Sequence, residues 1–333
     1  MAEQLKRSYL EDLKIFEGTK ARLLFFALLA ALAVFGLVAG EYALYVATTL
    51  AVFVIAAMGL NLLVGYTGQI SLGHAAFLAV GAYTHVLLYT QGLPFFVAAA
   101  AGAVVAGCCG WLLGLPALKL RGPYLAICTL GFQVAVDQIL GRWESVTGGR
   151  MGLGVPAVDE VATVASAIGI SQSTLYFLVC ALLTTLTLLG VYNVTRSRVG
   201  RALVAIRDNE TAAEAAGVDL VRYKTLSFAL SAAITGLAGA LYAHLFDRIN
   251  PSNFTLMLSI ELLVMVLVGG LASVLGSVLG AALLILSQNL LTGFRDYQSI
   301  IVGGILVAVL LFEPMGLRGR WLRMKYYLKA WPF

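Results

Sequence analysis

The chain alternates long apolar stretches with short polar ones, and the apolar stretches recur along its whole length. A helix needs about 20 apolar residues to cross the hydrocarbon core of a bilayer. Glycines interrupt the third, eighth and ninth of the stretches that approach this length. We predict ten spanning helices, over residues 22–39, 42–64, 70–90, 93–115, 123–141, 173–195, 225–246, 256–272, 274–291 and 298–313. The predicted fold class is an all-α, polytopic transmembrane helical bundle with some glycine-interrupted helices.

Composition agrees with a membrane protein. Of the 333 residues, 60% are hydrophobic and 12% are charged, whereas soluble domains carry about 25% charged residues. No stretch between the apolar segments is long enough for a separate soluble domain, so we predict one transmembrane domain over residues 1–333. Its first part, residues 1–21, alternates apolar and charged positions one helical turn apart, which predicts an amphipathic helix lying at the membrane interface.

The lysine and arginine residues indicate an orientation. With the N-terminus inside, the N-terminal segment holds five of them, the turn at 116–122 two, the loop at 196–224 six and the C-terminal tail five, which is 18 of the 22 in the chain. Cytoplasmic loops carry such an excess. We therefore predict that both termini are cytoplasmic. The net charge of +5 reflects this orientation in a lipid bilayer, and we expect no nucleic-acid partner.

One charged run, residues 196–224, is set between two apolar segments. Gly200 to Asp208 reads as a short helix, and Asn209 interrupts it. Thr211 and Glu214 have the spacing of a capping box for a second helix, and Gly217 is suited to the left-handed residue that ends it. Two capped helices would form a rigid knob on which another subunit can push. The alternative is a solvated connector, although a connector needs only a few residues.

A second stretch, residues 60–74, mixes glycines with polar side chains inside an apolar region. Gly68, Gln69, Ser71 and His74 follow one another there. Polar side chains are costly at membrane depth and face protein or a water-filled cavity, and glycines allow a helix to break where the backbone lines such a cavity. The stretch is therefore either part of a substrate path or a tight turn with close helix packing. Residues 268–276 repeat the pattern weakly.

The longest loop on the other side, residues 142–172, contains four glycines between Thr147 and Gly154. It reads as a turn-rich cover over a pore mouth, as a docking surface for a delivery protein, or as a flexible connector. Asp137 and Glu261 lie within predicted spans near this side. They are candidates for a proton relay or ion site, or else they are satisfied near the interface.

Several kinds of chemistry have no residues to carry them in this sequence. It has no Gly-Lys pair, so it lacks the phosphate-binding loop that holds ATP. Its three histidines show no zinc-ligand spacing, and no nucleophile elbow occurs. We predict that the chain is not an enzyme and binds no cofactor or metal of its own.

Four motifs and one helix together resemble the membrane permease subunits of branched-chain amino-acid ABC importers. The motifs are NLLVGYTGQISLGHAAFLAVGAY (61–83), KLRGPYLAICTLGF (119–132), TGGRMGLGVP (147–156) and SRVGRALVAIRDNETAAEAAGVDLVRYK (197–224), which the helix TLSFALSAAITGLAGALYAH (225–244) follows. The resemblance covers nearly the whole chain. The long outer loop and the N-terminal extension make it more similar to the longer of the two paired permeases.

The resemblance implies a transport subunit of the bacterial inner membrane. It would form a path for branched-chain or related small amino acids together with a second, homologous permease. Two cytoplasmic ABC ATPase subunits would bind the ATP, and a periplasmic substrate-binding protein would deliver the substrate. Urea, amides and other amino acids stay open as substrates. A lone ion-coupled transporter that uses Glu261, Asp137 or His74, and a passive channel, are the alternatives.

The resemblance also implies two sets of site residues. The loop at 196–224 is similar to the cytoplasmic coupling helix of the family, although its glycine comes earlier than in the family's pattern. The expected ATPase-coupling residues are Arg207, Asn209, Thr211, Glu214, Ala215, Ala216 and Gly217. The expected substrate-path residues are Gly68, Gln69, Ser71, His74 and Thr129.

Overall fold

A computed structural model describes residues 19–118, 120 and 122–290, together with seven single positions between 303 and 319. Most of the predicted interfacial helix at 1–21 and of the predicted tenth span at 298–313 lies outside the described residues.

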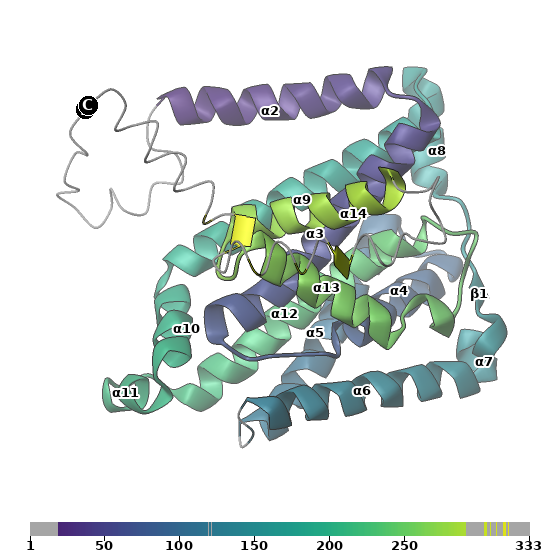
Figure 1. Cartoon of the computed structure of the whole chain (residues 1–333). Helices are drawn as coiled ribbons and strands as arrows, with labels where there is room; N and C mark the ends of the chain where they lie inside the picture. Colours follow the sequence, from purple (N-terminus) through teal and green to yellow (C-terminus); the bar gives the residue numbers. More distant parts are fainter. Residues whose placement is uncertain are drawn as a thin grey trace.

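The described chain is a bundle of helices (Figure 1). The bundle helices are α2 (Thr19–Val38), α3 (Glu41–Thr67), α4 (His74–Thr90), α5 (Phe95–Ala117), α6 (Pro123–Arg142), α9 (Gln172–Arg196), α12 (Leu220–Ala243), α13 (Leu256–Gly269) and α14 (Val274–Leu290). The short elements are α7 (Glu144–Thr147), η1 (Gly149–Met151), α8 (Asp159–Ile168), α10 (Arg198–Asp208), α11 (Glu210–Ala215) and η2 (Pro251–Asn253). The strand β1 (Leu153–Gly154) pairs antiparallel with β2 (Arg248–Ile249).

Each of the first nine predicted segments overlaps one bundle helix. Among the described residues, six helices are long and apolar enough to cross a membrane. The chain is therefore an all-α, polytopic membrane protein, and the number of ten spans stays a prediction. Three predicted ends are wrong: α4 begins at His74 and not at residue 70, α13 ends at Gly269 and not at 272, and α12 begins at Leu220 and not at 225. The first two errors fall at glycine-rich stretches, where hydropathy continues but the helix does not. The third arises because the helix starts at the Asp219 cap, before the apolar run begins.

Helices α3 and α12 form the centre of the bundle. In each of them 67% of an apolar stretch of 18 residues is buried, whereas the same measure is 28% in α5 and α6 and 33% in α9. A helix that is apolar on every side is expected to be surrounded by other helices, and α3 is buried all round from Ala51 to Gly65. The outer helices instead direct apolar side chains such as Trp111 and Ile127 away from the bundle, which suits contact with lipid.

Glycines allow the central helices to approach closely. A Cβ atom added to Gly81 of α4 would overlap the carbonyl oxygen of Gly236 in α12, and one added to Gly239 would overlap that of Leu78. Membrane helices associate through such small residues because lipid supplies little hydrophobic driving force between helices.

Two regions stand at opposite ends of the bundle (Figure 1). The elbow (residues 197–217) contains α10 and α11. The distal region (residues 143–169 and 244–253) contains α7, η1, β1, α8, β2 and η2. Helix α9, with 25 residues, runs from the distal region to the elbow and so separates them by the length of the bundle.

Candidate functional site

Side-chain caps define both helices of the elbow. The Ser197 hydroxyl accepts the Val199 N–H at 3.1 Å, so α10 begins two residues before the predicted Gly200. The Asn209 side chain accepts the Ala212 N–H at 3.0 Å and caps α11 in the same way. Serine and asparagine are favoured at this position because they satisfy N–H groups that have no partner within the helix. The predicted capping box of Thr211 and Glu214 is therefore wrong, because α11 already starts at Glu210.

The end of the elbow follows the prediction. Gly217 has φ +84°, the left-handed conformation that glycine adopts without strain. Its N–H donates to the Glu214 carbonyl at 2.9 Å, and the Val218 N–H donates to the Ala213 carbonyl at 3.0 Å. This pair of bonds is the usual way in which a helix ends. The elbow is consequently a compact pair of capped helices.

One side of α11 is exposed to solvent. Ala213 is buried, whereas all seven expected ATPase-coupling residues are exposed, five of them between Thr211 and Gly217. The five on α11 and the turn that ends it are Thr211, Glu214, Ala215, Ala216 and Gly217. The structure thus gathers them on one surface at the tip of the elbow. Asn209 is also exposed, and its side chain serves as the cap of α11.

The other side of the elbow packs on the bundle. Leu203 of α10 is fully buried against Met58 and Leu62 of α3 and Val191 of α9. Ile206, one turn further on, is 2% exposed. The predicted apolar side of this helix therefore binds it to the central helix α3.

Arg207 is exposed, but its guanidinium reaches the end of α3 and not the tip of the elbow. Its Nη1 donates to the Gly65 carbonyl of α3 at 3.1 Å, and its Nε and Nη2 donate to the neighbouring Asp208 carboxylate at 3.1 and 3.0 Å. Its stem lies against Gly68, where an added Cβ would be 2.9 Å from the Arg207 Cγ. The structure therefore separates Arg207 from the other expected coupling residues.

A buried ion pair joins the elbow to α12. The Lys224 ammonium lies 2.5 Å from a Glu210 carboxylate oxygen, and the side chains are 3% and 25% exposed. Removing a charged group from water costs several kcal/mol (about 3–5 when its partner is lost). Sequence reasoning missed this pair. Its only signal was a lysine placed one turn into a helix long enough to span the membrane.

Residues 68–73 form a non-helical segment between α3 and α4, called the extended segment below. The chain leaves the end of α3 and runs back into the bundle without helix (Figure 1). Burial alternates along it: Gln69 and Ser71 are buried, whereas Gly68 is exposed and Ile70 is 43% exposed. This period of two is that of an extended chain, so the segment has an inner edge and an outer edge.

The segment ends at half the depth of the bundle. His74, the first residue of α4, binds Ser231, which lies halfway along α12. Helix α4 has 17 residues, or about 25 Å, which is less than the roughly 30 Å of a hydrocarbon core. The extended segment therefore supplies the remaining depth, which is the arrangement of a broken span.

Both nitrogens of His74 have partners. The Ser231 hydroxyl donates to the Gly59 carbonyl at 2.6 Å, so its oxygen accepts the proton of His74 Nε2 at 2.7 Å. His74 Nδ1 then accepts from the Ser71 hydroxyl at 2.9 Å. The ring therefore donates one hydrogen bond and accepts one, which satisfies both nitrogens of a neutral imidazole. His74 thus fixes the end of the extended segment.

Thr129 holds the same segment from α6. Its hydroxyl accepts the Leu72 N–H at 2.9 Å, and an added Cβ at Gly73 would lie 2.5 Å from the Thr129 carbonyl oxygen. The side-chain oxygen of Gln69 lies 3.4 Å from the Ser227 hydroxyl of α12. The structure therefore brings all five expected substrate-path residues together. Four of them direct their polar groups into protein, and Gly68 lies on the exposed outer edge.

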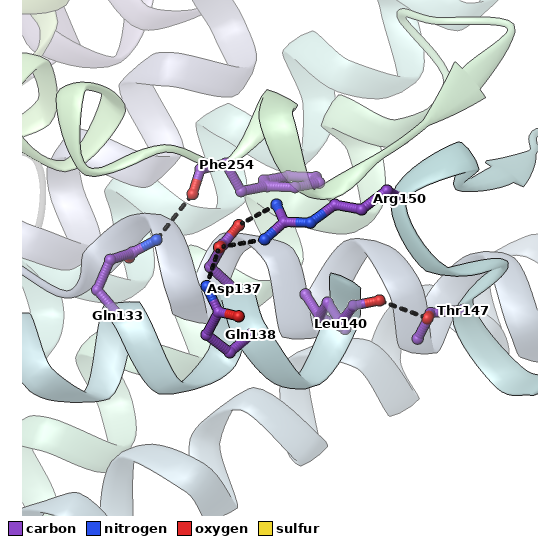
Figure 2. A network of polar contacts seen from close by, with 7 residues as sticks. All are labelled: Gln133, Asp137, Gln138, Leu140, Thr147, Arg150 and Phe254. Atoms are coloured by element: carbon purple, nitrogen blue, oxygen red, sulfur yellow. Dashed lines mark hydrogen bonds and ion pairs between the residues drawn. The ribbon is translucent and has the colours of Figure 1, made fainter. Parts of the chain in front are cut away.

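A further polar chain continues from α4 through α13 to α6 and was not predicted. The Ala75 N–H donates to the Ser259 hydroxyl at 2.9 Å, and that hydroxyl donates to Gln133 at 3.3 Å. Gln133 in turn donates to the Phe254 carbonyl at 2.7 Å (Figure 2). The available signal was the spacing of Thr129, Gln133 and Asp137, which lie four residues apart and so share one side of α6.

The last of these, Asp137, anchors the distal region. Its carboxylate accepts hydrogen bonds from both terminal nitrogens of Arg150, at 3.2 and 3.1 Å (Figure 2). Thr147 donates to the Leu140 carbonyl at 2.6 Å. Burial alone would raise the pKa of Glu160 in α8, but hydrogen bonds from the Phe95 N–H and the Tyr89 hydroxyl lower it. The loop at 142–172 is therefore an ordered region and not a flexible connector.

Among the described residues, no group of three or more His, Cys, Asp or Glu side chains is arranged to hold a metal ion. Glu261, the other acid predicted within a span, hydrogen-bonds to Gln288 of α14.

The family model described as "Branched-chain amino acid transport system / permease component" matches residues 42–310. The LivM permease of the high-affinity branched-chain amino acid transport system of Salmonella typhimurium is 33% identical over 318 residues, which cover 90% of this chain and 75% of that protein. LivM of Escherichia coli is 34% identical over 82% of this chain and 69% of its own length. LivH of Escherichia coli is 23% identical over 80% of this chain and 91% of its own length.

No solved structure matches the chain significantly. The identity to LivM is higher than that to LivH, which agrees with the resemblance to the longer permease. The family model covers most of the chain, and the apolar helices are those of a membrane protein. The chain therefore belongs to the family of branched-chain amino acid transport system permease components.

Proposed function

We propose that this chain and a second, homologous permease form the path of an ATP-driven importer for branched-chain or related small amino acids in a bacterial inner membrane. Two cytoplasmic ATPase subunits bind and hydrolyse the ATP, and a periplasmic binding protein delivers the substrate. Support for the second permease comes from Escherichia coli, in which two different permeases of one transport system, LivM and LivH, are both similar to this chain.

The elbow carries the proposal. Its tip exposes a surface of short side chains and one carboxylate on α11, and its base is buried against α3. Exposed small residues allow a partner to approach the helix backbone, and a helix with both ends capped keeps its shape under load. An ATPase subunit that binds this tip would move the elbow as a body.

The positive charge supports a cytoplasmic elbow. Residues 196–224 hold six of the 22 lysine and arginine residues, and cytoplasmic loops carry such an excess. The distal region then faces the periplasm, where the binding protein docks. Ten spans, an even number, place both termini in the cytoplasm.

The outer edge of the extended segment is the proposed lining of the path. Non-helical backbone at membrane depth is tolerated where it is buried in protein or lines a water-filled cavity, and Gly68 and Ile70 are exposed within the bundle's depth. An apolar side chain at Ile70 suits an aliphatic substrate, and it offers no charge that would hold an amino acid tightly in transit.

Reconstitution tests the proposal. Liposomes that hold the chain with its second permease and both ATPases should take up leucine only when ATP and the binding protein are supplied, and the chain alone should take up none. Glu214→Pro should abolish uptake because proline breaks the interior of α11. Arg198→Pro is the control, since proline is tolerated at the first residue of a helix. Uptake by the chain alone, or undiminished uptake by Glu214→Pro, would refute the proposal.

A further inference from the structure

Two sets of contacts leave the elbow, and both end at the start of the extended segment. One set passes through Arg207 of α10 and the other through Glu210 of α11. Neither uses the exposed tip of the elbow. They are therefore separate from the surface that an ATPase subunit would bind.

The first set reaches the end of α3 directly. Gly65 is among the last four residues of α3, whose carbonyl groups lack N–H partners within the helix. The N–H of Gln69 turns back to the Leu63 carbonyl instead of Gly65. Arg207 supplies the partner that the Gly65 carbonyl would otherwise lack, and its stem covers Gly68.

The second set reaches the segment through one turn of α12. Glu210 pairs with Lys224, and the Ser227 hydroxyl, one turn later, donates to the Lys224 carbonyl at 2.7 Å. The same hydroxyl lies 3.4 Å from the side-chain oxygen of Gln69. Lys224 and Ser227 are both buried, so this route runs through the interior.

We propose that Arg207 and the Glu210–Lys224 ion pair are positioning residues that transmit movement of the elbow to residues 68–70. The inference rests on the proposed function, since an ATPase must move the elbow. When α10 moves, Arg207 would pull both Gly65 and Gly68 with it. When α11 moves, the ion pair would pull α12, and Ser227 of α12 would displace Gln69. Because the segment is not helical, its outer edge can follow the elbow without unwinding a helix.

The labelling rate of a cysteine at position 70 tests this. Ile70→Cys is introduced after the four native cysteines are replaced by alanine. The full importer is reconstituted, and labelling by a water-soluble maleimide is measured without nucleotide and with ATP plus vanadate. In this parent protein we expect the two rates to differ by about tenfold, within the usual range of coupling between sites.

Four variants of the parent protein separate the contribution of Arg207 from that of the Glu210–Lys224 ion pair. Arg207→Met keeps the stem over Gly68 and removes the donors. Glu210→Gln combined with Lys224→Met removes the ion pair without leaving one charge buried. We expect each to reduce the tenfold ratio to about twofold or less, and the combined variant to abolish it. Arg207→Lys, which keeps a donor, should restore part of the ratio.

The controls distinguish transmission from folding. All variants should co-purify with the ATPases and still hydrolyse ATP, because the tip of the elbow is unchanged. Arg198→Met, which removes a charge from an exposed position of the same helix, should keep the parent ratio. If the parent responds to nucleotide and the variants respond equally, transmission through Arg207 and the ion pair is refuted and the proposed function stands. If the parent does not respond while the importer takes up leucine, transmission to residues 68–70 is refuted and the proposed function stands; if it neither responds nor takes up leucine, both are refuted.

Discussion

The elbow and the distal region are both compact, water-facing structures, but they are attached to the bundle in different ways. The elbow is joined through a buried ion pair and through Arg207, which binds the end of a central helix. The distal region is joined through the ion pair of Arg150 and Asp137, whose side chains are 53% and 30% exposed, and through glycines with positive φ at the turn between α7 and β1.

The difference indicates different tasks. An exposed ion pair is screened by water and contributes little, so the distal region keeps its shape mainly by backbone geometry. Separating a buried ion pair costs several kcal/mol because one charge is left without its partner. The elbow and the start of α12, which carry Glu210 and Lys224, must therefore move together. Five substitutions test this contrast, and they are ordered by the expected size of their effect.

Glu210→Ala should have the largest effect. It leaves the Lys224 ammonium buried without its partner, which should lower the free energy of unfolding by about 4 kcal/mol. Thermal unfolding of the purified chain in detergent measures this. Lys224→Met added to Glu210→Ala should recover most of the loss. A stable Glu210→Ala protein would mean that the pair does not attach the elbow.

Gly152→Ala should have the next largest effect, on the distal region. Gly152 has φ +74°, and an added Cβ would overlap the Ile249 carbonyl oxygen across the two-stranded pair. Strain and displacement together should cost about 3 kcal/mol. Loss of docking by the binding protein with retained ATP hydrolysis is the expected result. Gly154→Ala, where an added Cβ meets nothing within 4 Å, is the control.

Ser231→Ala tests the interior between the two regions. It removes the acceptor of His74 Nε2 and the donor to the Gly59 carbonyl, which should cost about 2 kcal/mol in unfolding free energy. Ser287→Ala removes a serine whose hydroxyl binds only a carbonyl of its own helix, and it should cost less. Equal stabilities of the two variants would contradict the role of His74 in fixing the segment.

Asn209→Ala should remove the cap of α11 and cost about 1 kcal/mol. Thr211→Ala should leave stability unchanged, because the Ala212 N–H is capped by Asn209 and not by Thr211. The reverse result would restore the capping box that the sequence suggested.

Arg150→Met should have the smallest effect, below about 1 kcal/mol, because the pair it breaks is largely exposed. The loss should shrink further at high salt, where exposed charges are screened. A loss as large as that of Glu210→Ala would remove the contrast between the two regions.

Hydropathy was enough to predict nine bundle helices, because the length and apolarity of a span are local properties. It failed at residues 70–73, where Leu72 and Ile70 continue the apolar pattern but Thr129 and Ser231 hold the chain extended. The cap was misplaced because Asn209 and Thr211 are both good cap residues, and only the helix start separates them. The contact of Arg207 with the end of α3 and the partner of Lys224 depend on elements far apart in sequence, so no local pattern could indicate them.

The central claim is that the elbow and the extended segment move as one body relative to the distal region. Spin labels at Ala215 and Ile70, and in a second sample at Ile70 and Met151, allow the two distances to be measured by pulsed electron paramagnetic resonance in the assembled importer. On addition of ATP and vanadate, the distance between positions 215 and 70 should stay the same and that between 70 and 151 should change. A changed distance between 215 and 70, with a constant distance between 70 and 151, would contradict the account.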